Sequence, residues 1–178
     1  MKYLIFSDLH GSEESAKLVV KKFYEFDCEG LICLGDVLYH GPRNELPESY
    51  NPKKVIEILN PLADKILCIK GNCDAEVDEM VLSFPLASAK DLILNGLHFH
   101  LEHGHHLTED SSKEGIILFG HTHIPLMERK GSQIFLNPGS ITIPKNNSKR
   151  SFMVLENRNV KLYDIENHML GSFDLEKN

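Results

Sequence analysis

Short apolar runs alternate with amphipathic stretches in the first third of the chain. The run KYLIFS, followed by Asp8 and Gly11, is typical of a buried strand. After it, apolar side chains recur at helical spacing, with Ser12 as a candidate N-cap and two glutamates in the first turn. The elements alternate as β-α-β-α-β, an order that predicts a parallel sheet with helical crossovers. The predicted strands cover residues 2–7, 30–35 and 65–71, and the predicted helices follow Ser12 and cover residues 53–60, where Pro61 ends the second one.

The rest of the chain is rich in short strand-like runs separated by tight turns. Asn95-Gly96 lies between two such runs and is the strongest short signal for a hairpin. Three last runs indicate a closing antiparallel meander. No change in composition along the chain marks a domain boundary. We therefore expect residues 1–178 to form one α/β domain of two packed sheets with helices outside. The remaining predicted strands are 117–120, 126–130, 133–137, 151–156, 159–165 and 168–175.

The net charge of the chain limits which binding partners are expected. The 178 residues carry a formal net charge of −7, which argues against a general binder of nucleic acid or anionic membranes, because such partners need a basic face. No apolar run approaches the ~20 residues of a membrane span, and the N-terminus does not read as a signal peptide. We therefore expect a cytoplasmic protein without stable nucleic-acid or membrane binding, and leave homo-oligomerisation open.

Five predicted strands are each followed by residues that can bind a metal ion. The carboxyl ends of strands in α/β sheets face the ligand crevice, so these side chains should converge. Each element alone would be an ordinary loop, turn or cap. Five of them, each after a strand, indicate a metal site. The residues are Asp8 and His10, Asp36, Asn72 and Asp74, His103 and His105, and His121 and His123.

This series resembles the calcineurin-like metallophosphoesterase superfamily. The loops GDVLYHGPRN, GNCDAEVDEM, GHTHIP and NPGSITIPKN look like those of the small bacterial YfcE-type phosphodiesterases, and the matching blocks span residues 5 to about 155. The resemblance implies a four-layer α/β/β/α sandwich of two mixed sheets with a two-metal site. The matching motifs are Asp8-x-His10, Gly35-Asp36, Gly71-Asn72-x-Asp74, His103-Gly104 and Gly120-His121-x-His123.

The resemblance also implies a ligand for each metal position. Asp36 would bridge two divalent cations, which a shared carboxylate can hold about 3.5–4 Å apart. Mixed nitrogen and oxygen donors suit Mn²⁺, Fe²⁺, Co²⁺, Ni²⁺ or Zn²⁺, and the resemblance favours Mn²⁺. The implied ligands are Asp8, His10 and His123 for one cation, Asn72, His103 and His121 for the other, and Asp36 for both.

The chemistry implied is hydrolysis of small phosphodiesters by a metal-bridging hydroxide, with Asp36, Asn72 and His105 in the catalytic group. His105 is a candidate contact to phosphate or bound water. Arg43 could fork onto a phosphate oxygen. Asp74 could orient ligand imidazoles through their free N–H.

Cys73 marks a departure from the broad superfamily. Many members have histidine there, which protonates the leaving group, whereas a thiol is a poor substitute with a reference pKa of about 8.5 and no positive charge. The YfcE-like members also lack this histidine. We expect Cys73 to contact the substrate rather than act as a nucleophile, because the sequence identifies no neighbouring residue that could serve as its general base.

Two other functions stay open. A phosphomonoesterase would use the same metal site, and a scaffold like the retromer subunit of this fold would not use it for catalysis. A nucleic-acid-binding module is disfavoured by the net charge. Lys145, Lys149 and Arg150 form a small basic cluster, which could lie at the substrate rim but which we interpret as solvated.

Asp36→Asn should abolish turnover and leave the fold intact, because it removes the bridging charge without changing side-chain volume. Activity assays beside circular dichroism of the variant check this. Retained activity in a folded Asp36→Asn protein would contradict the two-metal assignment.

Overall fold

A computed structural model describes residues 1–107 and 115–176. Its elements, in chain order, are β1 (Lys2–Phe6), α1 (Glu13–Glu25), β2 (Gly30–Cys33), α2 (Pro52–Leu59), η1 (Asn60–Lys65), β3 (Ile66–Ile69), η2 (Glu76–Met80), β4 (Leu86–Ala87), β5 (Ala89–Leu94), β6 (Leu97–Glu102), β7 (Gly115–Leu118), β8 (Pro125–Lys130), β9 (Gln133–Pro138), β10 (Ser151–Glu156), β11 (Asn159–Asp164) and β12 (Met169–Asp174).

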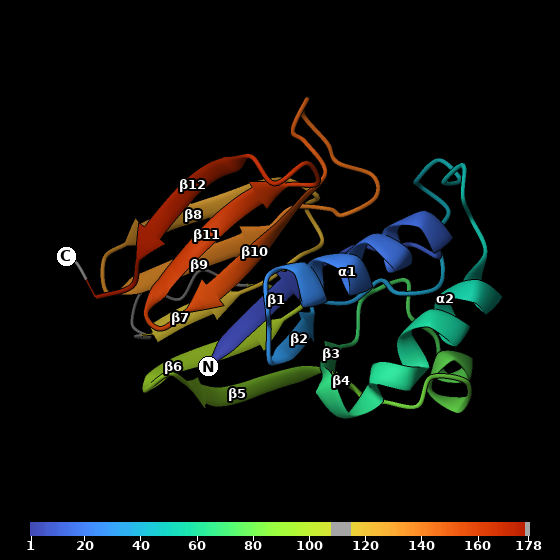
Figure 1. The fold of residues 1–178 in the computed structure, drawn as a ribbon, viewed down its shortest axis with the longest axis horizontal. Helices are drawn as coiled ribbons and strands as arrows, with labels where there is room; N and C mark the ends of the chain where they lie inside the picture. Colours follow the sequence, from blue (N-terminus) through green and yellow to red (C-terminus); the bar gives the residue numbers. More distant parts are fainter. Residues whose placement is uncertain (108–114, 177–178) are drawn as a thin grey trace.

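The strands form two mixed sheets that pack face to face (Figure 1). The seven-stranded sheet has the order β12-β11-β10-β1-β2-β3-β4, and the five-stranded sheet has the order β5-β6-β7-β9-β8. β1, β2 and β3 run parallel, as do β6, β7 and β9. Within each group the strands therefore end at the same edge. The α/β fold of two packed mixed sheets predicted from the sequence is confirmed.

The first strand shows why its sequence is almost continuously apolar. Leu4 and Phe6 pack beneath α1 and α2, while Ile5 points into the core between the two sheets. A strand that is buried on both faces has no solvent side and so no polar alternation. On α1, Val19 and Phe23 complete the core on the helix side, and the Ser12 hydroxyl caps the helix by accepting from the Ser15 N–H at 3.1 Å.

The Asn95-Gly96 hairpin is confirmed between β5 and β6, with both residues at positive φ. The second α-helix ends just before Pro61, as expected: α2 stops at Leu59, and the 3-10 helix η1 follows with Pro61 in its first turn, where no backbone N–H is needed. The run from Leu86 to Leu94 forms two separate strands, β4 and β5. β4 pairs with β3 in one sheet, and β5 pairs with β6 in the other.

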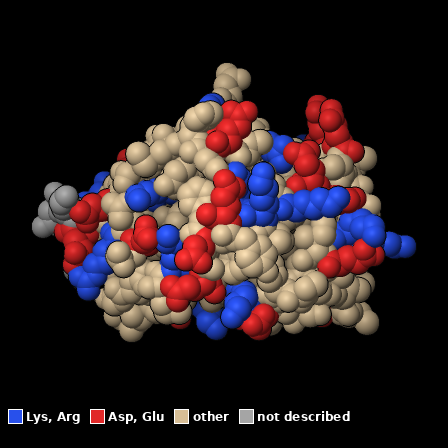
Figure 2. Space-filling view, viewed as in Figure 1, with Lys and Arg blue, Asp and Glu red and all other residues tan. Residues whose placement is uncertain are grey.

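Both α-helices pack on the seven-stranded sheet. Among residues 1–107 and 115–176, the outer face of the five-stranded sheet carries a small apolar cluster of Ile117, Phe119 and Phe135 and no α-helix. Acidic and basic side chains are interspersed on the face seen in Figure 2. No helix in the described part of the chain is long and apolar enough to cross a membrane.

Leu101→Ala should lower the free energy of unfolding by about 2–5 kcal/mol, because Leu101 is fully buried in the core between the sheets. Ile93→Ala, on the neighbouring strand and 62% exposed, is the matched control and should change it by less than about 0.5 kcal/mol. Urea unfolding followed by circular dichroism measures both. Equal losses in the two variants would contradict this packing.

Candidate metal centre

The predicted metal-binding residues lie on five loops that meet at one end of the sandwich. The loops after β1, β2 and β3 come from one sheet, and those after β6 and β7 come from the other. Five of the seven predicted ligands have φ between 49° and 64°, a left-handed backbone conformation that is uncommon for residues other than glycine. Such strain persists only where the surroundings fix the backbone, and it is concentrated at functional sites. These five are Asp8, His10, Asp36, His121 and His123.

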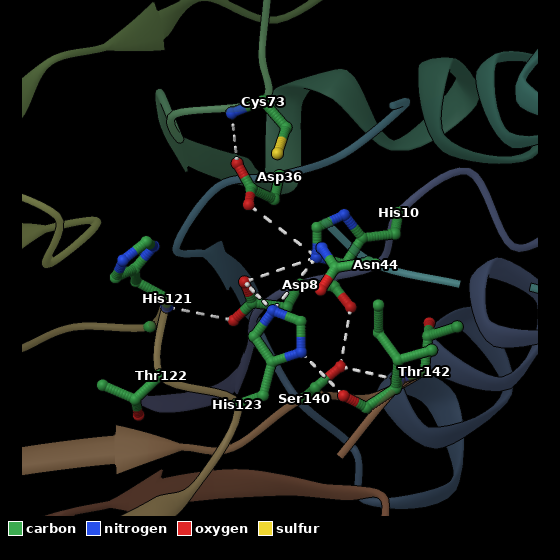
Figure 3. A network of polar contacts seen from close by, with 12 residues as sticks. Asp8, His10, Asp36, Asn44, Cys73, His121, Thr122, His123, Ser140 and Thr142 are labelled. Carbon is green, nitrogen blue, oxygen red and sulfur yellow. Dashed lines mark hydrogen bonds and ion pairs between the residues drawn. The ribbon is translucent and has the colours of Figure 1, made fainter. Parts of the chain in front are cut away.

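Asp8, His10 and His123 form the first group of donors (Figure 3). The Nε2 atoms of the two imidazoles lie 3.2 Å apart, and Asp8 Oδ1 is 3.2 Å from His123 Nε2. Each ring donates its Nδ1–H to a backbone carbonyl, His10 to Tyr39 at 2.9 Å and His123 to Ile143 at 2.6 Å. Because Nδ1 carries the proton, the Nε2 lone pairs face each other.

Asp36, His103 and Asn72 form the second group. His103 donates its Nδ1–H to the Leu34 carbonyl at 2.6 Å, so its Nε2 lone pair faces the donors of this group. That Nε2 is 3.1 Å from Asn72 Oδ1 and 3.3 Å from Asp36 Oδ2. The ring of His121 lies edge-on to His103, with 5.2 Å between the centroids.

Asp36 lies between the two groups. Its Oδ2 is 3.7 Å from His10 Nε2 and 3.3 Å from His103 Nε2. Its other oxygen, Oδ1, accepts a hydrogen bond from the Cys73 backbone N–H at 2.8 Å. One oxygen is thus fixed by the protein, and the other is directed toward imidazoles of both groups.

The electrostatics of this region favour a positive charge. Burial raises the pKa of Asp8, but His10 and His123 outweigh it, so the pKa lies below its ordinary value. Burial lowers the pKa of His103, but the neighbouring Asp36 carboxylate outweighs it and raises the pKa to about 9. Lowered carboxylate and raised imidazole pKa values both mean that the site stabilises added positive charge.

The donor set fits a divalent cation. Asp8 Oδ1 is buried and has no hydrogen-bond donor, and a buried carboxylate oxygen left in this state is costly. The facing Nε2 lone pairs of His10 and His123 would also repel each other without a cation or proton between them. Nitrogen and oxygen donors with hydrogen-bonded imidazoles are the arrangement expected around a bound transition metal.

Asp74 has a different role from the one expected. Its carboxylate accepts from the backbone N–H groups of Asp36, Val37 and Gly71 at 2.7–2.8 Å and does not contact the imidazoles. It ties the loop after β2 to the loop after β3. The two loops are so close that a Cβ at Gly71 would collide with the Asp36 carboxylate. Backbone carbonyls orient the imidazoles instead.

A pocket of about 310 Å³ opens over the donors. Arg43 and Cys73, both expected to contact substrate, line this pocket together with Asp36 and Asn72. His105 does not line it. This exposed side chain lies on the side of His103 and His121, with 6.1 Å between its ring centroid and that of His121.

The Cys73 thiol is protonated at neutral pH. Burial and the nearby Asp36 carboxylate raise its pKa to about 12. A thiol in this state is a weak nucleophile and no efficient acid for a leaving group.

The predicted basic cluster is divided in the structure. Lys149 pairs with Asp164, and Arg150 pairs with Glu14. Lys145 is exposed and lines the pocket, the substrate-rim position that was the less favoured alternative for this cluster.

Sequence reasoning also missed the supports of the metal centre. The Ser140 hydroxyl donates to the Asp8 carbonyl at 2.9 Å, and the Asn137 amide donates to the Gly120 carbonyl at 2.7 Å. The loop NPGSITIPKN was among those that resemble the family, but that resemblance did not indicate that its side chains hold two ligand loops. The carbonyls of Tyr39, Leu34 and Ile143 have no sequence signal, because every residue type carries one.

Comparison with known proteins agrees with this geometry. The family model of the calcineurin-like phosphoesterase superfamily domain matches residues 1–159. The chain is 40% identical over 162 residues to phosphodiesterase YfcE of Escherichia coli (strain K12), which covers 88% of each chain. It is 29% identical over 176 residues to the probable metallophosphoesterase YsnB of Bacillus subtilis (strain 168), with 92% of this chain and 91% of YsnB covered.

Solved structures agree as well. The structure of the E. coli phosphoesterase YfcE superimposes with a TM-score of 0.93 at 36% identity and covers 99% of this chain and 100% of that one. Zinc-complexed Vps29 from Entamoeba histolytica superimposes with a TM-score of 0.67 at 22% identity, with 99% of this chain and 100% of that one covered. The second likeness is one of fold alone.

Asp74→Asn should lower the free energy of unfolding by about 1–3 kcal/mol and reduce turnover, because its amide would turn a donor toward at least one backbone N–H. Urea unfolding and steady-state kinetics measure the two effects. Asp78→Asn is the control, since Asp78 accepts from the Ala75 N–H outside the site and its loss should spare turnover. Wild-type stability and turnover in Asp74→Asn would contradict the role given to this carboxylate.

Proposed function

The chain belongs to the calcineurin-like phosphoesterase superfamily, and on that premise we propose that it is a metal-dependent phosphodiesterase with a two-metal site. The substrate class is small phosphodiesters. The whole chain, residues 1–178, acts as one domain in this proposal.

The position of Asp36 carries the proposal. Its Oδ2 lies within 3.7 Å of His10 Nε2 and within 3.3 Å of His103 Nε2, and these imidazoles belong to separate donor groups. A carboxylate oxygen between imidazole nitrogens of two donor groups is suited to bridge two cations. The Asp36 carboxylate is also held in place by the Cys73 N–H.

Seven side chains would hold the cations, and Mn²⁺ is the proposed metal on the basis of the family resemblance. When bound, the two cations lower the pKa of a shared water and neutralise charge on the phosphoryl oxygens. The proposed ligands are Asp8, His10 and His123 at one position, Asn72, His103 and His121 at the other, and Asp36 at both.

The chain's own groups orient these ligands and admit the substrate. The Nδ1–H bonds to the carbonyls of Tyr39, Leu34 and Ile143 keep three Nε2 atoms directed inward. Asn72 supplies Oδ1 beside His103 Nε2. His105 lies outside the pocket lining, on the side of His103 and His121, so its exposed imidazole would contact only a part of the substrate that extends beyond the pocket; burial and His103 lower its pKa.

Diesters are favoured over monoesters because the relative that is 40% identical is named a phosphodiesterase. Cys73, with its pKa raised to about 12, offers no efficient proton donor, so the diesters with good leaving groups should react best.

A protein-binding scaffold is the second candidate, because the zinc-complexed Vps29 has the same fold. The pocket argues for catalysis, since it leads from the surface to the metal-binding donors and has basic side chains beside them. A structural metal would need no such opening.

Chelator-stripped protein should hydrolyse bis(p-nitrophenyl) phosphate only after Mn²⁺ is added, and at least about tenfold faster than p-nitrophenyl phosphate, a difference of about 1.4 kcal/mol in activation free energy. Absorbance of the released nitrophenolate measures both rates. His103→Gln should lose this activity, while His98→Gln, an exposed histidine on the same strand, should keep it.

Faster cleavage of the monoester would move the assignment to a phosphomonoesterase. If folded protein cleaves neither ester with Mn²⁺, Zn²⁺, Co²⁺ or Ni²⁺, the scaffold candidate is favoured.

A further inference from the structure

Two basic side chains line the pocket in a chain that is acidic as a whole. Arg43 and Lys145 are both exposed, and neither side chain has a hydrogen bond or ion pair among residues 1–107 and 115–176. Most other basic residues near the metal centre are neutralised, as Lys149 and Arg150 are by Asp164 and Glu14. The two unpaired cations therefore face the pocket with their full hydrogen-bonding capacity.

Arg43 and Lys145 both lie on loops that are hydrogen-bonded to the metal centre. The carbonyl of Tyr39 holds His10, and Arg43 follows four residues later. The carbonyl of Ile143 holds His123, and Lys145 follows two residues later. The Lys145 backbone N–H also donates to the His123 carbonyl at 3.2 Å. The backbone segments that carry Arg43 and Lys145 are thus held in a fixed position relative to His10 and His123, two proposed ligands of the same metal ion.

The rest of the pocket offers little to an apolar or aromatic group. Its lining holds no Phe, Tyr, Leu, Ile or Val side chain, and Pro42 is its main apolar surface. Its two aromatic rings, His121 and His123, belong to proposed metal ligands, so a nucleobase or an aryl group would find no free ring to stack on. The lining residues not yet named in this context are Gly41, Asn44 and Thr122, which are small or polar.

We propose, resting on the phosphodiesterase function above, that Arg43 and Lys145 form a subsite for a second anionic group of the substrate. The preferred substrates are then compact phosphodiesters that carry a carboxylate or a further phosphate beside the scissile phosphate. The Arg43 guanidinium matches two oxygens of such a group, and the Lys145 ammonium adds a point charge. The two cations also attract an anionic substrate that the net charge of −7 would otherwise repel.

A matched pair of ligands tests this without turnover. Calorimetry on Mn²⁺-loaded protein should show that 3-phosphonopropanoate binds at least about tenfold more tightly than propylphosphonate, which lacks the carboxylate. Lys145→Gln and Arg43→Gln should each reduce this ratio toward one, and Lys145→Gln should leave propylphosphonate binding nearly unchanged. Lys53→Gln, an exposed lysine on α2, is the control and should keep the ratio.

Turnover separates a failure of this inference from a failure of the proposed function. The wild type should cleave the p-nitrophenyl phosphodiester of glycolate with a higher kcat/KM than p-nitrophenyl phosphocholine, mainly through KM. Lys145→Glu should reverse that order. Equal binding of the two phosphonates, or the same preference in Lys145→Glu, overturns the subsite even if diesters are cleaved. Absence of all diester turnover overturns the proposed function, while the phosphonate ratio still decides the subsite.

Discussion

Three hydrogen bonds from imidazole Nδ1–H groups to backbone carbonyls decide how the metal centre is arranged. They link His10 to Tyr39, His103 to Leu34 and His123 to Ile143 at 2.6–2.9 Å. A carbonyl can only accept, so each bond fixes a proton on Nδ1 and leaves Nε2 as the atom that can bind the metal ion. Without these bonds the rings could turn or change tautomer, and the donors would no longer converge.

The backbone around these donors is strained and crowded, and neighbouring groups hold it in place. Asp8 and Asp36 are both at positive φ, a conformation that costs about 1–3 kcal/mol per residue. The Asp74 carboxylate offsets part of this cost by accepting three backbone N–H groups from two loops. Ser140 does the same for the Asp8 carbonyl. The folded two-sheet core thus holds Asp8 and Asp36 in a backbone conformation that is locally unfavourable.

The loops that orient the imidazoles also form the entrance to the site. The segment after Asp36 carries both the Tyr39 carbonyl and Arg43, and the segment after β9 carries both the Ile143 carbonyl and Lys145. A change in either loop would therefore act on metal binding and on substrate binding together.

The sequence by itself determined the order of strands and helices in the first third, the Asn95-Gly96 hairpin, and the residue types able to bind metal after five strands. Such signals are local, because a periodicity or a turn depends on residues a few positions apart. Only the tertiary structure decided that β4 and β5 belong to different sheets, that Asp74 holds backbone rather than imidazoles, and that Lys145 faces the pocket. These features depend on distances between segments far apart in the chain and on backbone carbonyls, which every residue carries and no side-chain pattern can mark.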